Sequence, residues 1–83
     1  MMNKKYLITG INGYIASFMT KYIKTLNPNS EIYGVLRKGS LLKEELTDLV
    51  TDLVCYDKKK YLYLDRNNNE LDFSKFDYVI HLA

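Results

Sequence analysis

The residues best suited to chemistry in this chain form a short glycine-containing segment, Thr-Gly-Ile-Asn-Gly-Tyr-Ile-Ala, at positions 9–16. A strand that enters such a turn and then a helix presents unpaired backbone N–H groups and the positive end of the helix dipole to a phosphate. Gly10 permits the sharp turn, Gly13 lets a phosphate approach the backbone, and Ala16 keeps the helix close to the strand. The segment therefore predicts a dinucleotide site. The residues expected to contact the pyrophosphate are Gly10, Asn12, Gly13, Tyr14 and Ile15.

Two glycines three residues apart also occur in tight turns with only a structural role, and this remains the alternative. The surrounding sequence favours the binding site, because an apolar run that is typical of a buried strand precedes the turn at residues 6–9. After the turn, apolar residues recur at helical spacing and predict one apolar helix face. Its members are Ile15, Phe18, Met19, Tyr22, Ile23 and Leu26.

Basic residues end the second predicted strand, residues 31–36, and suggest which dinucleotide would bind. NAD sites usually have an acidic residue here, whose carboxylate binds the ribose 2′-hydroxyl and repels a 2′-phosphate. This chain has Arg37, Lys38 and Ser40 instead, which offer donors suited to a phosphate. We therefore expect NADP as the cofactor, with NAD as the alternative. The competing interpretation is a solvated strand end, since basic residues are mostly exposed.

Three motifs in order along the chain resemble those of the extended short-chain dehydrogenase/reductases, the NAD(P)-dependent epimerase/dehydratase family. The first is Gly-x-x-Gly-x-x-Ala after Thr9, and the second, Leu-Tyr-Leu-Asp at 62–65, is similar to the end of the family's third strand. The third, Asp-Tyr-Val-Ile-His-Leu-Ala at 77–83, resembles its fourth-strand motif. The resemblance covers essentially the whole chain. It implies the NAD(P)-binding segment of a nucleotide-sugar epimerase, dehydratase or reductase.

The resemblance also implies an adenine site. Asp65, like its family counterpart, would accept a hydrogen bond from the adenine amino group, while Leu82 and Ala83 would lie on the other side of the ring. Arg66 stands where the family often has an aliphatic residue, and we expect it to stack on the ring. The alternative for Asp65 is a solvated carboxylate at a strand end.

The family's catalytic Tyr-x-x-x-Lys pair lies beyond the fourth strand, so the resemblance implies no catalytic residue in this chain. The Tyr-x-x-x-Lys at residues 56–60 lies at the wrong place along the sequence and is interpreted as a coincidence. We expect residues 1–83 to be the N-terminal portion of a longer enzyme whose remaining part binds the nucleotide sugar. The alternative is a non-catalytic dinucleotide-binding fragment or truncated gene product. Full-length members of the family are often homodimers.

The element order predicts an α/β fold. Strands are expected at residues 6–9, 31–36, 61–65 and 77–82, helices at 15–26 and 42–54, and a short helical or irregular piece at 71–76. Such alternation is typical of a parallel sheet with right-handed crossovers. We therefore predict the first four strands of a Rossmann-like doubly wound sheet, in the order 3-2-1-4.

Composition excludes several classes of function. Twelve basic and ten acidic side chains give no field that favours nucleic acid or a membrane surface. No apolar run approaches the ~20 residues of a membrane helix. The single cysteine, Cys55, excludes an internal disulfide and fits a reducing cytoplasm, and no metal-ligand spacing of Cys and His occurs.

Overall fold

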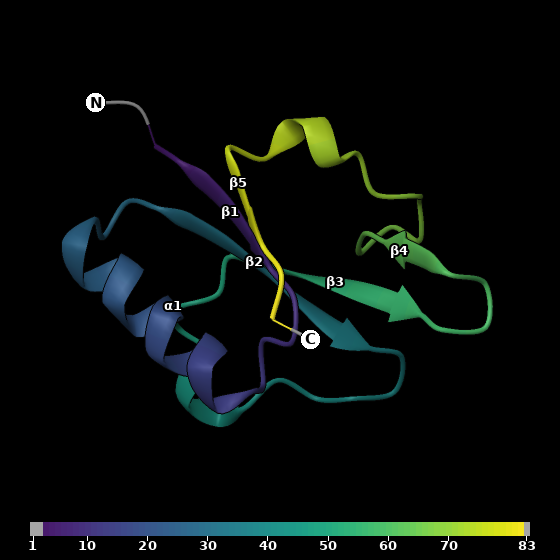
Figure 1. Cartoon of the computed structure of the whole chain (residues 1–83), viewed down its shortest axis with the longest axis horizontal. Coiled ribbons are helices and arrows are strands. Elements are labelled where there is room, and N and C mark those ends of the chain that lie inside the picture. Colours follow the sequence, from purple (N-terminus) through teal and green to yellow (C-terminus); the bar gives the residue numbers. More distant parts are fainter. Residues whose placement is uncertain (1–2, 83) are drawn as a thin grey trace.

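The chain alternates strands and helices along most of its length (Figure 1). The computed structural model describes residues 3–82. Its elements are β1 (Lys5–Ile8), α1 (Tyr14–Leu26), β2 (Glu31–Arg37), the 3₁₀-helix η1 (Glu44–Leu46), β3 (Asp52–Asp57), β4 (Leu62–Leu64), the 3₁₀-helix η2 (Phe73–Lys75) and β5 (Tyr78–Ile80).

The five strands form one mixed sheet in the order β4-β3-β2-β1-β5. Three of the pairings, β1 with β2, β2 with β3 and β1 with β5, are parallel, and β3 pairs with β4 antiparallel. The expected α/β class with a mostly parallel sheet is confirmed, and the last strand lies beside β1 as expected. The predicted four-strand order 3-2-1-4 is wrong, because the sheet has a fifth strand and its third strand comes from a different segment.

The predicted helix at 42–54 is replaced by a single 3₁₀ turn and the strand β3. The apolar spacing holds as far as Leu46, Leu49 and Val50, all of which pack against the main core. From Asp52 onward the chain pairs in parallel with β2, from Tyr33 opposite Asp52 to Arg37 opposite Tyr56. This pairing gives the backbone of residues 52–56 partners on β2, which outweighs a helical preference that depends only on side-chain spacing.

The predicted third strand at 61–65 is the antiparallel edge strand β4. Only four residues, 58–61, separate β3 from β4. A parallel connection needs about a dozen residues, so a link this short can only return antiparallel. Tyr61 adopts the left-handed conformation, with φ of 56°, where the hairpin turns back.

Helix α1 packs on the sheet through small residues rather than through its large apolar ones. Its buried members are Ala16, Ser17, Thr20 and Ile23. Of the predicted apolar face only Ile23 is buried, whereas Ile15, Phe18, Tyr22 and Leu26 are each more than half exposed. The small side chains let the helix axis approach the strands closely, which leaves the larger ones on its outer flank.

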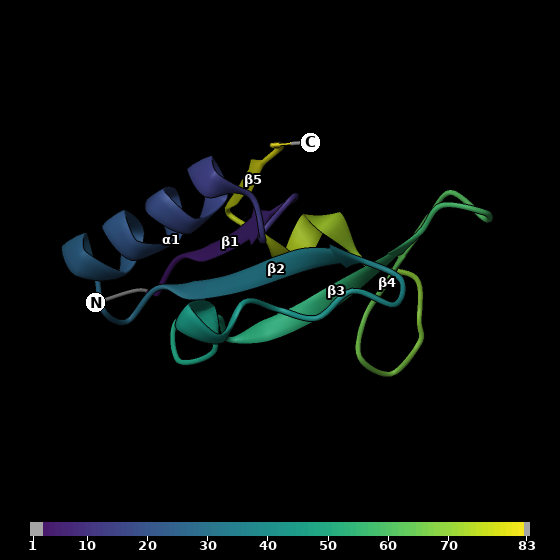
Figure 2. The ribbon, with the colours of Figure 1, turned by 90° about the horizontal axis from the view of Figure 1, so that it is seen from below.

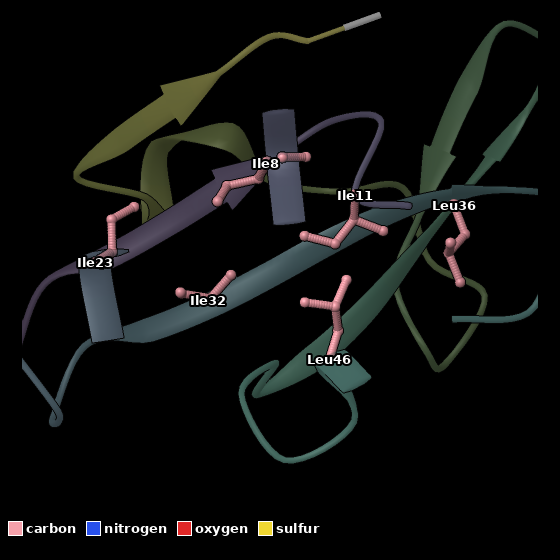
Figure 3. Close-up of a cluster of buried hydrophobic side chains, with 7 residues drawn as sticks. Ile8, Ile11, Ile23, Ile32, Leu36 and Leu46 are labelled. Carbon is pink, nitrogen blue, oxygen red and sulfur yellow. The ribbon is translucent and has the colours of Figure 1, made fainter. Parts of the chain in front are cut away.

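The main core lies between α1, η1 and one face of the sheet. Figure 3 shows Leu46 of η1 pointing toward Ile11, which follows β1, while Ile8, Ile23, Ile32 and Leu36 surround them. A second cluster covers the other face, where Leu7, Val35 and Val54 are packed by the segment leading to β5. In Figure 2, α1 lies alongside β1 and β2, at the end of the molecule opposite the β3–β4 turn.

Gly34 of β2 provides the space that Ile11 occupies. A Cβ atom at Gly34 would lie 2.7 Å from the Ile11 Cγ1 atom, and Ile11 is fully buried, so it cannot move aside. We expect Gly34→Ala to lower the free energy of unfolding by about 1–3 kcal/mol, as other overpacking substitutions do. Urea unfolding measures this loss. The same substitution in an Ile11→Ala background should cost clearly less, and equal costs in the two backgrounds would contradict the contact.

Candidate functional site

The turn between β1 and α1 leaves backbone donors free. Gly10 has a φ of 63°, and its carbonyl accepts a 2.8 Å hydrogen bond from the Gly13 N–H. The first helical bond runs from the Ser17 N–H to the Gly13 carbonyl, at 3.0 Å. Within residues 3–82, the N–H groups of Tyr14, Ile15 and Ala16 donate to no protein acceptor. These three donors form the positive end of the α1 dipole.

In the described part of the chain, no side chain at the start of α1 competes with an external anion for these N–H groups. Gly13 is the N-cap residue and has no side chain to accept these bonds, and α1 has no acidic residue in its first turn. A Cβ atom at Gly13 would lie only 3.1 Å from the Gly10 carbonyl oxygen, so the turn is closely packed at this point. Free N–H groups at a helix start are able to bind an anion.

A cavity of about 760 Å³ opens in front of this turn, at the carboxyl ends of the parallel strands. Its volume lies in the range of small-molecule sites. Eight of the residues predicted to bind the cofactor line it: Gly10, Asn12, Gly13, Tyr14, Ile15, Arg37, Ser40 and Leu82. Lys38 is not among the lining residues, and Ala83 lies outside the described part of the chain. In Figure 1 the ends of β2 and β3 lie on the same side of the molecule as the β1–α1 turn.

The Asn12 side chain holds the loop after β2 in place. Its Nδ2 donates to the Leu41 carbonyl at 2.7 Å, and its Oδ1 accepts from the Lys43 N–H at 2.9 Å. Both polar atoms of the side chain are therefore engaged within the protein. Asn12 contributes to the cavity by fixing the loop that contains Ser40, a role that the sequence did not predict.

Thr9 connects the end of β1 to the segment that follows β5. Its Oγ1 accepts a 2.8 Å hydrogen bond from the Leu82 N–H and lies 3.1 Å from the His81 Nδ1. Thr9 is 6% exposed, so its hydroxyl is a buried polar group that these contacts satisfy. The contacts place His81 and Leu82 on the wall of the cavity.

We expect Thr9→Val to lower the free energy of unfolding by about 1–3 kcal/mol, because the Leu82 N–H would lose its acceptor. Thermal unfolding followed by circular dichroism measures this change. Thr9→Ser retains the hydroxyl and should restore most of the stability. Thr25 bonds to the Lys21 carbonyl on the exposed side of α1, so Thr25→Val is a control that we expect to be nearly neutral. Equal losses in Thr9→Val and Thr25→Val would contradict the role of Thr9.

The basic residues Arg37, at the end of β2, and Lys38, directly after it, differ in their surroundings. Arg37 lines the cavity and is exposed. Lys38 instead turns to β3, where its N–H donates to the Tyr56 carbonyl at 3.1 Å and its Nζ lies 3.8 Å from the Asp57 Oδ2. Partial burial raises the pKa of Asp57, but backbone hydrogen bonds from Lys60 and Lys59 and the charges of Lys38 and Lys60 hold it below its ordinary value. Asp57 is therefore ionised at neutral pH and shapes the turn after β3.

Asp65 and Arg66, predicted to lie on one side of the adenine, do not line the cavity in front of the glycine turn. The Asp65 Oδ1 accepts from the N–H groups of Asn67 and Asn69, at 2.9 Å each, and Arg66 Nε lies 3.1 Å from the Asp52 Oδ1. Both line a second hollow, which shares Leu36, Arg37 and Ser40 with the first. The reason is the direction of β4: because it is antiparallel, its end points away from the carboxyl edge of the parallel strands.

The cavity-lining residues that the sequence did not identify as part of the site include Tyr56, Tyr63 and His81. Tyr56 lies two residues after the buried Val54, on the same face of β3, so it would have been placed with Val54 if residues 52–57 had been interpreted as a strand. Tyr63 lies at the cavity because the β3–β4 hairpin places it opposite Tyr56. His81 is exposed and hydrogen-bonded to Thr9.

Comparisons of the chain with protein-family models, with curated proteins and with solved structures found no match. Within residues 3–82, no helix is long and apolar enough to cross a membrane. The same part of the chain contains no group of three or more His, Cys, Asp or Glu side chains placed to hold a metal ion.

Proposed function

We propose that this chain binds a nicotinamide dinucleotide, with the pyrophosphate over the β1–α1 turn. The observation that supports this is the joint presence of free N–H groups at residues 14–16 and a cavity in front of them. A turn with only a structural role does not require such a cavity. The strand-turn-helix order and the sharp conformation of Gly10 also agree with the geometry of pyrophosphate sites.

The proposed dinucleotide is NADP rather than NAD. Arg37 stands at the end of β2 on the cavity wall, where NAD sites usually have a carboxylate. Its guanidinium forms no ion pair within the described residues, whereas Lys38 and Arg66 each lie next to an aspartate. Arg37 and the Ser40 hydroxyl are therefore the groups proposed to bind the 2′-phosphate.

The chemistry proposed for the whole protein follows from the resemblance to the NAD(P)-dependent epimerase/dehydratases. In such an enzyme the cofactor takes a hydride from a sugar carbon or gives one to it. This chain would hold the cofactor of such an enzyme, whose substrate would be a nucleotide sugar. The other candidate is a dinucleotide-binding fragment with no catalytic role.

The experiment that tests the proposed function is a calorimetric titration of the chain, in which NADP, NAD and adenosine are each added separately. We expect saturable binding of NADP, weaker binding of NAD, and much weaker binding of adenosine, which lacks the pyrophosphate. Absence of binding to both dinucleotides by the folded chain would contradict the proposal. Binding of NADP and adenosine with equal affinity would contradict the assignment of the pyrophosphate to the β1–α1 turn.

A further inference from the structure

Two tyrosines face each other across the β3–β4 hairpin and form one wall of the cavity. Tyr56 and Tyr63 are direct cross-strand partners, and their ring centroids lie 4.8 Å apart with an interplanar angle of 44°. The edge of the Tyr63 ring also packs against Phe73, at 5.4 Å and 81°. Both tyrosines are half-buried, so each ring is supported from behind and still borders the cavity.

The hairpin that carries these rings is held firmly. The Asp57 Oδ1 accepts hydrogen bonds from the N–H groups of Lys59 and Lys60, at 3.0 and 3.4 Å, and Tyr61 takes the left-handed conformation that closes the turn. Beyond β4, the Leu71 N–H donates to the Tyr63 carbonyl at 2.8 Å. A planar ligand would therefore meet a preorganised aromatic surface, which reduces the entropy lost on binding.

Not every aromatic residue of this sheet face reaches the cavity. Tyr33 packs edge-on against Phe76, at 5.0 Å and 81°, in the same cluster as Tyr56 and Tyr63. Tyr33 does not line the cavity, whereas Tyr56 and Tyr63 do. Packing within this cluster is enough to explain the position of Tyr33. It does not explain why the rings of Tyr56 and Tyr63 border a cavity large enough for a ligand.

The order of the strands indicates which part of a dinucleotide would meet these rings. Along the carboxyl edge the cavity wall runs from Tyr63 and Tyr56 on β4 and β3, through Arg37 on β2, to Gly10 after β1. With the pyrophosphate at Gly10 and the 2′-phosphate of the adenosine ribose at Arg37, the adenine continues toward β3. The nicotinamide half then extends in the other direction, toward His81 and Leu82 beside β5.

We propose that Tyr56 and Tyr63 form the stacking surface for the adenine ring of the bound nucleotide, in place of the expected Asp65 and Arg66. This inference rests on the proposed dinucleotide function. Stacking of a base on an aromatic side chain is independent of hydrogen-bond readout, so the tyrosine rings supply affinity and not the choice between NADP and NAD.

The test compares 5′-AMP and nicotinamide mononucleotide, the two mononucleotide halves of NAD, in calorimetric titrations of the full chain. We expect Tyr63→Leu and Tyr56→Leu each to weaken AMP binding about tenfold, with nicotinamide mononucleotide affinity and the ratio of NADP to NAD affinity unchanged. Tyr63→Phe retains the ring and should bind AMP like the parent. Tyr33→Leu is the matched control, because it removes an aromatic residue of the same cluster that does not border the cavity.

Several outcomes would overturn this proposal. They are a parent chain that does not bind AMP, an unchanged AMP affinity in both leucine variants, an equal loss in Tyr33→Leu, or a loss confined to nicotinamide mononucleotide. The last would place the nicotinamide on the tyrosines. If the parent binds AMP through these rings but neither dinucleotide, the stacking surface is supported and the proposed dinucleotide function fails.

Discussion

Gly13→Val is expected to weaken NADP binding at least tenfold, which corresponds to a loss of about 1.4 kcal/mol or more in binding free energy. The valine methyl groups would stand over the free N–H groups of residues 14–16, where the phosphate must lie. The φ of Gly13, −71°, is one that valine adopts, and the closest contact of the new Cβ is the Gly10 carbonyl oxygen at 3.1 Å. The expected effect is therefore on the ligand more than on the fold.

The control for this prediction is a graded pair of substitutions. Gly13→Ala adds one methyl group, which lies 3.1 Å from the Gly10 carbonyl oxygen, and should have a smaller effect than valine. Thermal unfolding of both variants separates lost binding from lost structure. If Gly13→Val keeps the parent's affinity while remaining folded, the pyrophosphate does not bind at this turn.

Arg37→Asp is expected to reverse the cofactor preference. Loss of a charge-assisted bond to the 2′-phosphate costs about 1.5–3 kcal/mol, which is roughly a tenfold to hundredfold loss of NADP affinity. The new carboxylate would repel the 2′-phosphate and could accept a hydrogen bond from the 2′-hydroxyl of NAD. The measurement is the ratio of NADP to NAD dissociation constants before and after the substitution, at one fixed ionic strength.

Lys38→Asp is the matched comparison for Arg37→Asp. It makes the same change in charge one residue away, but Lys38 lies next to Asp57 and does not line the cavity. We expect it to change the ratio much less than Arg37→Asp does. A parent chain that prefers NAD, or equal changes in the two variants, would show that Arg37 does not select the cofactor.

The sequence by itself determined the first third of the molecule and the glycine turn of the candidate site. The strand, the turn at Gly10 and Gly13, and helix α1 depend on interactions between residues close in sequence, so their patterns are sufficient. The end of β2 at Arg37 follows in the same way. Even here the packing of α1 was not determined, because helical spacing does not say whether large or small residues meet the sheet.

Only the tertiary structure decided the region from residue 42 to residue 65. The apolar spacing of this region fits a helix, yet the free edge of β2 pairs in parallel with residues 52–56. Once β3 forms there, the four-residue link at 58–61 obliges β4 to return antiparallel. Because β4 runs in that direction, Asp65 and Arg66 lie away from the cavity and Tyr63 is brought next to Tyr56. Which side chains line the outer half of the site therefore depends on long-range strand pairing, which a local pattern does not contain.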